Sequence, residues 1–216
     1  MESNEYRNRP CYGELWAIIL AGLVHVLTEI GLSESIALFY SASISIAFVG
    51  YLLWRAMRTR GVLKTWGMRS DNFWPALRAQ LAFGVVGVIV LVGVGAASGS
   101  LALPRTFWLT VALYPIWGVA QQFALQNLIA RNLVGVLSNP LAIAAVSSTL
   151  FGMSHFPRLD LMFLTLVAGV FFTLIYRRVP NLWAVGIVHG VLGSLAIYIV
   201  LEEDPGAAIL SYIMDL

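Results

Sequence analysis

The chain has 216 residues, of which 59% are hydrophobic and 11% are charged, and its formal net charge is +2. A soluble domain carries roughly a quarter charged residues, so composition excludes a single water-facing globule. With a mean hydropathy of +0.83, we expect an integral membrane protein whose first partner is the lipid bilayer. The single cysteine, Cys11, excludes an internal disulfide, and we expect no nucleic-acid partner.

Seven stretches of the sequence approach the roughly 20 apolar residues that a spanning helix needs. The predicted fold class is therefore all-α, a polytopic transmembrane helix bundle of about seven spans that forms a single integral membrane domain over residues 1–216. Proline favours helix starts and disfavours helix interiors. A proline lies at or shortly before the start of four of the stretches. The stretches are 15–33, 36–54, 80–98, 106–130, 139–155, 161–176 and 181–200.

Basic residues predict the orientation of these spans. With seven spans and a cytoplasmic amino terminus, 11 basic residues fall on the inside, and only Arg105 and Arg158 fall outside. This bias predicts a multi-pass protein of a bacterial cytoplasmic membrane with a polar cytoplasmic segment at residues 1–14. The connection at residues 55–79 holds six basic residues and two tryptophans, which is typical of a segment lying on an anionic leaflet.

The first predicted span contains His25 and Glu29, which are four residues apart and share a helix face. Glu29 is the only carboxylate deep in a predicted span, whereas Glu14 sits near an end. One interpretation is a His–Glu pair that stabilises packing, a second is a residue near the outer interface, and a third is a carboxylate that serves a functional site.

Polar residues of three later spans predict a membrane-embedded site. Gln121, Gln122, Gln126 and Asn127 interrupt the fourth apolar stretch. Each amide without a partner in hydrocarbon costs free energy, so the cluster is expected to face other polar groups inside the bundle. Singly, such amides commonly hold helices together. Together with the histidines of the fifth and seventh stretches, His155 and His189, they predict one polar cavity.

The spacing of these residues resembles the CPBP family, which contains the CAAX prenyl endopeptidases of the second type and the bacteriocin-processing and Abi-type glutamic intramembrane proteases. The family is marked by Glu-Glu-x-x-x-Arg, then Phe-x-x-x-His, then His-x-x-x-Asn, each on a different helix. The first motif corresponds to Gln121-Gln122-x-x-x-Gln126, and Phe151 with His155 matches the second. His189 is the first residue of the third motif. Gly193 occupies the position of that motif's asparagine, and Ser194 follows it. The resemblance covers residues 106–200.

The resemblance implies an intramembrane endopeptidase that acts on a membrane-associated peptide or protein, without cofactor or metal. In the family a glutamate and a histidine activate water, and histidine and asparagine hold the oxyanion. Here both glutamates are glutamines, and a glutamine amide cannot accept the proton. The predicted catalytic residues are His155, His189, Gln121 and Gln122, and the residues expected to support substrate or oxyanion are Gln126, Asn127, Phe151 and Ser194.

Several alternatives stay open at this point. In one, the chain is a catalytically inactive pseudoprotease that binds or protects a membrane client. In a second, His155 or His189 takes the proton, because histidine has a suitable pKa for that role. In a third, Glu29 with His25 supplies a relocated carboxylate. A small-solute transporter is a further possibility, although no inverted repeat supports it. Two histidines without a third ligand do not favour catalytic zinc.

Overall fold

A computed structural model describes residues 10–214, so most of the predicted polar segment 1–14 lies outside the described residues. The described part is mostly helical and contains no strand, which confirms the all-α fold class. Within residues 10–214, five helices are long and apolar enough to cross a membrane, and one shorter apolar helix comprises Pro140–Met153. The chain is an integral membrane protein, and the number of spans stays a prediction.

The helices form two compact units. The first unit comprises residues up to Arg69 together with Phe123–Arg178, and the second comprises Ser70–Gln122 together with Val179 onwards. The helices of the first unit are α2 (Tyr12–Gly31), α3 (Glu34–Arg58), α4 (Val62–Thr65), the π-helix η1 (Ala124–Ala130), α7 (Arg131–Leu133), α8 (Pro140–Met153) and α9 (Leu159–Arg178). Those of the second are α5 (Phe73–Ser98), α6 (Phe107–Phe123), α10 (Leu182–Ile199) and α11 (Pro205–Met214).

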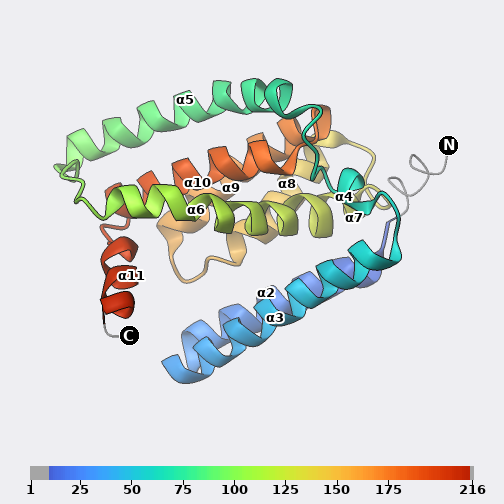
Figure 1. Ribbon diagram of the computed structural model, residues 1–216, viewed down its shortest axis with the longest axis horizontal. Coiled ribbons are helices and arrows are strands. Elements are labelled where there is room, and N and C mark those ends of the chain that lie inside the picture. The colour runs from blue at the N-terminus through green and yellow to red at the C-terminus, as the bar shows by residue number, and fades with distance from the viewer. Residues whose placement is uncertain (1–9, 215–216) are drawn as a thin grey trace. The chain divides into compact units, whose positions relative to one another are not determined.

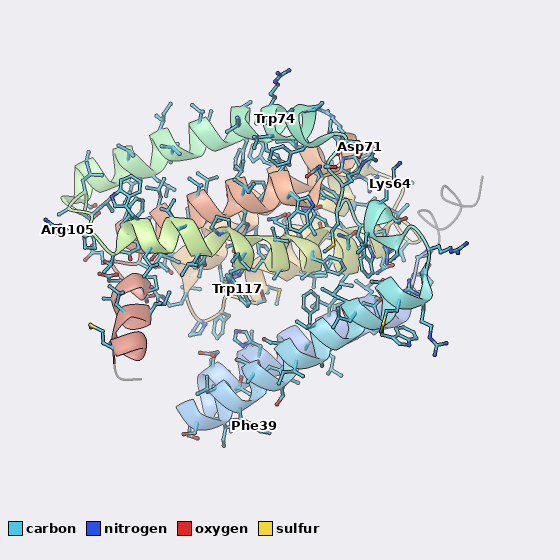
Figure 2. The ribbon with its side chains drawn as sticks, viewed as in Figure 1. Phe39, Lys64, Asp71, Trp74, Arg105 and Trp117 are labelled. Atoms are coloured by element: carbon cyan, nitrogen blue, oxygen red, sulfur yellow. The ribbon has the colours of Figure 1, made fainter. Side chains whose placement is uncertain are left out.

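Within each unit, long helices pack in pairs. In the first unit α2 lies along α3, as Figure 1 shows, and α8 packs against α9. In the second unit α5 packs against α10. Large apolar side chains remain exposed on the helices of both units, and Figure 2 labels Phe39 on α3, Trp74 on α5 and Trp117 on α6 among them. Exposed apolar surface of this extent suits contact with lipid chains.

Proline and asparagine set the helix starts, as the sequence predicted. Helix α8 begins at Pro140, and the side chain of Asn139 accepts a hydrogen bond from the backbone N–H of Leu141 at 2.8 Å. Helix α10 begins after Asn181, whose side-chain oxygen accepts from the N–H of Ala184 at 3.0 Å. These contacts satisfy N–H groups that a helix leaves unpaired at its first turn.

The basic connection at residues 55–79 differs from a segment that lies wholly on a membrane surface. Trp74 is exposed, but Trp66 is only 1% exposed and packs edge-on against Phe123, with ring centroids 4.9 Å apart. The backbone carbonyl of Trp66 accepts hydrogen bonds from Asn127 at 3.2 Å and from the Tyr176 hydroxyl at 2.9 Å. The start of the connection is therefore part of the core of the first unit.

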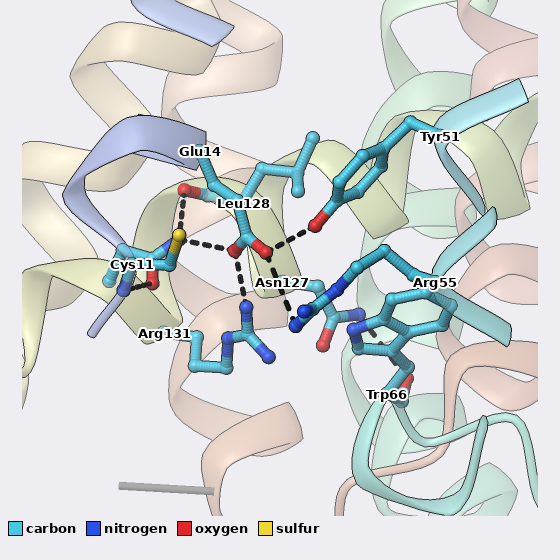
Figure 3. A network of polar contacts seen from close by, with 9 residues as sticks. Cys11, Glu14, Tyr51, Arg55, Trp66, Asn127, Leu128 and Arg131 are labelled. Atoms are coloured by element: carbon cyan, nitrogen blue, oxygen red, sulfur yellow. Dashed lines mark hydrogen bonds and ion pairs between the residues drawn. The ribbon is translucent and has the colours of Figure 1, made fainter. Parts of the chain in front are cut away.

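A buried charge cluster joins three segments of the first unit (Figure 3). The carboxylate of Glu14 on α2 pairs with Arg131 and with Arg55, the latter at 3.8 Å, and it accepts hydrogen bonds from Tyr51 and Asn132. Glu14 is 8% exposed. One carboxylate thus compensates two guanidinium groups and ties both helices of the α2–α3 pair to the segment that follows the π-helix.

Replacing Glu14 with glutamine tests this role. The change leaves two partly buried arginines facing a neutral amide, and removing one partner of a buried ion pair costs about 3–5 kcal/mol. We expect a marked fall in the thermal unfolding temperature of the purified protein in detergent. Glu202→Gln, at an exposed carboxylate, is the control and should leave that temperature unchanged. Equal unfolding temperatures for the two variants would contradict the assignment.

Candidate functional site

Close approach of α6 and α10 builds the site in the second unit. Glycines on α10 face bulkier residues on α6: a Cβ atom at Gly190 would lie 2.5 Å from the Cα atom of Pro115, and Gly186 is equally tight against Val119. Small residues let two helix backbones approach each other in a membrane. At this spacing, side chains beside the glycines can bridge the helices directly.

His189 makes that bridge. Its Nε2 atom lies 2.8 Å from Oε1 of Gln121, and its Nδ1 atom lies 2.8 Å from Nε2 of Gln122. Gln122 is fully buried and His189 is 8% exposed. The structure therefore brings together three of the four predicted catalytic residues, and each ring nitrogen of His189 is hydrogen-bonded to an amide of the neighbouring helix.

The hydrogen bonds indicate the protonation state of His189. An amide NH₂ group donates and an amide oxygen accepts, so Nδ1 accepts from Gln122 and Nε2–H donates to Gln121. The imidazole is then neutral. If the oxygen and NH₂ group of both amides exchange places, Nδ1 carries the proton instead of Nε2, and the ring is again neutral. No buried charge in this trio needs a counter-ion, which agrees with the absence of a glutamate at both motif positions.

The third motif differs from the family at its last residue, and the structure gives the reason. Gly193 stands where the family has asparagine, and a Cβ atom there would lie 2.7 Å from the ring of Tyr114. The tyrosine thus occupies the space that an asparagine side chain needs. Ser194, predicted to support the oxyanion, is buried and donates its hydroxyl to the carbonyl of Gly190 in its own helix at 2.8 Å.

His155 lies in the first unit, in the turn after α8. Its Nδ1 atom is 2.9 Å from the backbone carbonyl oxygen of Phe151, and the Phe151 ring meets the imidazole edge-on at 5.0 Å. Because a carbonyl oxygen only accepts, Nδ1 carries the proton. In the neutral ring, Nε2 then keeps the lone pair that a general base requires. Whether His155 and His189 converge stays a prediction.

The remaining predicted residues have partners that hold the first unit together. Gln126 on η1 donates to the hydroxyl of Thr173 on α9 at 3.3 Å, and Asn127 donates to Trp66, as described above. Both side chains are buried. The contacts show that Gln126 and Asn127 join segments of the first unit. Their predicted role in supporting substrate or oxyanion stays a prediction.

Sequence reasoning missed two features of this region. One is the π-helix η1, which begins at Ala124, two residues after Gln122; such segments are rare and are frequent at functional sites. The other is the Glu14 cluster. A signal for it existed, because Glu14, Arg55 and Arg131 all lie at span ends that the basic-residue bias places on the same side of the membrane. No group of three or more His, Cys, Asp or Glu that could hold a metal occurs among residues 10–214.

Comparison with known families finds a match to this region. Residues 103–195 match the family described as Rce1-like, type II CAAX prenyl endopeptidase. This region is Rce1-like. The match covers less than half of the chain but includes α6, the π-helix, His155 and His189, and it confirms the resemblance to the CPBP family. Searches of curated proteins and of solved structures gave no match. The matched family is described as one of type II CAAX prenyl endopeptidases.

Gly190→Ala tests the close approach that positions His189. The added methyl group meets backbone atoms, which cannot move aside as a flexible side chain can, so we expect a loss of about 1–3 kcal/mol in unfolding free energy. The control is Gly93→Ala on α5, where an added Cβ meets no atom within 4 Å. That change should be neutral or stabilise by up to about 1 kcal/mol. A neutral Gly190→Ala variant would contradict the packing.

Nitrogen-15 spectra of the three histidines test the protonation state of His189. In the unchanged protein at neutral pH, we expect one protonated and one unprotonated ring nitrogen. In Gln122→Glu the donor to Nδ1 becomes a carboxylate that only accepts, so we expect both ring nitrogens to be protonated. Single His25→Gln and His155→Gln variants assign the signals. A doubly protonated His189 in the unchanged protein would refute the neutral trio.

Proposed function

We propose that this protein is an intramembrane endopeptidase that cleaves a membrane-associated peptide or protein in a bacterial cytoplasmic membrane, with its amino terminus in the cytoplasm. The observation that carries the proposal is the Gln121–His189–Gln122 trio, which lies inside the Rce1-like region and presents a neutral polar group within apolar helices. A peptide bond is itself a neutral polar group, so such a trio suits it better than an ion.

We assign each role from the hydrogen bonds of the residue concerned. His155 is the general base, because its hydrogen bond to Phe151 fixes the proton on Nδ1 and leaves the lone pair on Nε2. His189 and the two glutamines position water or the substrate carbonyl by hydrogen bonding, since amides can donate and accept but cannot take up a proton. The proton from water goes to His155 and then to the leaving amine nitrogen.

A second candidate function is binding without cleavage. The specific observation in its favour is that both ring nitrogens of His189 are already engaged by amides. A pseudoprotease of this kind would hold a membrane client in the same polar site and protect or sequester it. The two candidates differ in one measurable respect, the appearance of new protein termini.

Comparison of membrane-protein termini in otherwise identical strains separates the two candidates. One strain lacks the protein, one carries it unchanged, and one carries His155→Ala with His189→Ala at matched abundance. We expect new termini that require the unchanged protein and vanish in the double variant. Glu202→Gln, at an exposed carboxylate, is the control and should preserve them. Identical termini in all strains would contradict hydrolysis and favour client binding.

A further inference from the structure

One face of α6 carries polar side chains that bond α10 at two levels. Thr110, Tyr114 and Gln122 recur on α6 at multiples of four residues, so they share a face. The Thr110 hydroxyl lies 3.0 Å from the hydroxyl of Tyr198 on α10, and Gln122 bonds His189 on the same helix. Tyr114 lies between these two contacts.

Tyr114 meets α10 through its ring and not through its hydroxyl. A Cβ atom at Gly193 would lie 2.7 Å from Cε1 of the ring and 3.7 Å from Cζ, which carries the hydroxyl. Within residues 10–214 this hydroxyl forms no hydrogen bond, and its oxygen is not enclosed. Glu203 acts on Tyr114 electrostatically, without a hydrogen bond between them. A hydroxyl without a partner costs free energy in apolar surroundings, so this one is available to a ligand.

The neighbouring trio uses most of its donors internally. One ring N–H of His189 and the amides of Gln121 and Gln122 supply its two hydrogen bonds. In either arrangement of the amides, Gln121 keeps at least one N–H that the trio does not use. Gln121 is seven residues from Tyr114, so both donors project from the same side of α6. Both are neutral, which suits neutral acceptors such as peptide carbonyls.

The spacing of this face matches an extended peptide. His189 and Gly193 are one turn apart on α10, which is about 6 Å along the helix axis, and the Tyr114 ring packs at Gly193. In an extended chain, carbonyls two residues apart point to the same side and lie about 6.8 Å from each other. A backbone that presents one carbonyl beside the trio therefore presents another near the Tyr114 hydroxyl.

We propose that the Tyr114 hydroxyl donates a hydrogen bond to a backbone carbonyl of the peptide substrate, two residues away from the cleaved bond, and so holds the substrate extended along α10. The inference rests on the proposed function and names what the site recognises, which is backbone and not a side chain. Tyr114 is a substrate-binding residue in this account. Its bond forms equally in the bound substrate and in the transition state, so it strengthens binding and leaves the chemical step unchanged.

Thermal unfolding in detergent tests whether the hydroxyl is free of internal bonds. Tyr114→Phe removes the hydroxyl and keeps the ring that packs at Gly193, so the unfolding temperature should stay unchanged. Tyr198→Phe is the matched contrast, because its hydroxyl donates to Asp204 at 2.6 Å and its loss should lower that temperature. An equal fall in both variants would show that the Tyr114 hydroxyl is bonded within the protein and would overturn the inference.

Binding of an uncleavable peptide tests the contact itself. The probe is a fluorescent prenylated peptide that ends in a CAAX sequence, with a ketomethylene group in place of the cleaved bond. Its Kd for the full-length protein in nanodiscs is measured by fluorescence anisotropy. Loss of one neutral hydrogen bond should raise the Kd about fivefold in Tyr114→Phe, whereas Glu203→Gln should leave it unchanged. An unchanged Kd in Tyr114→Phe, or no binding by the unchanged protein, would overturn the inference.

Thioamide substitution in the probe identifies the acceptor. A thioamide keeps the N–H and replaces the carbonyl oxygen with sulfur, a weaker acceptor. Thioamides are placed in turn two residues before and two residues after the ketomethylene group. One of them should weaken binding to the unchanged protein and cause no further loss in Tyr114→Phe, because the two changes remove the same bond. Thioamides at the adjacent carbonyls, which face the opposite side, are the controls. Independent losses at every position would contradict the assignment.

Cleavage of the corresponding amide peptide separates this inference from the proposed function. We expect Tyr114→Phe to raise KM about fivefold with kcat nearly unchanged, as loss of uniform binding does. A fall confined to kcat, or cleavage equal to that of the unchanged protein, would overturn the inference and leave the proposed function standing. Binding of the probe through Tyr114 with no cleavage by the unchanged protein would support the inference and overturn hydrolysis.

Discussion

The hydrogen bonds between His189 and the amides of Gln121 and Gln122 are the interaction on which the second unit depends. Polar groups in an apolar helix need partners, and charged ones need partners of opposite charge. Two amides and a neutral imidazole satisfy each other with no net charge. The glycines of α10 make the contact possible, because they let α6 come close enough for glutamine side chains on α6 to reach the imidazole on α10.

The first unit meets the same requirement with charges. Glu14 compensates two arginines, and these three residues lie near helix ends, where Arg and Lys side chains can reach the interface. Deeper in the apolar helices, the buried polar groups are neutral: Gln126 bonds Thr173, and Asn127 bonds a backbone carbonyl. The half-exposed His25–Glu29 pair agrees with this division, because Glu29 lies in the last turn of α2 and not deep in the span, as the sequence had suggested.

Much of this arrangement follows from sequence. The helix starts at Pro140 and Leu182 were predictable, since proline and asparagine have direct backbone consequences at those positions. The pairing of glutamines with His189 followed from the cost of unpaired amides. The π-helix was not predictable, because no local residue pattern specifies an extra residue in a turn. Nor was the reason for a glycine at position 193, which is that Tyr114 of another helix fills the space.

The central claim is that a site with amides in place of carboxylates still hydrolyses a peptide bond. The most direct measurement is oxygen-18 incorporation by the purified protein in vesicles, supplied with a prenylated peptide ending in a CAAX sequence in ¹⁸O-labelled water. The account predicts a product whose new carboxyl terminus carries the label, and no labelled product with the His155→Ala variant. An intact peptide that remains bound to the protein would contradict hydrolysis and identify the site as one that holds a client.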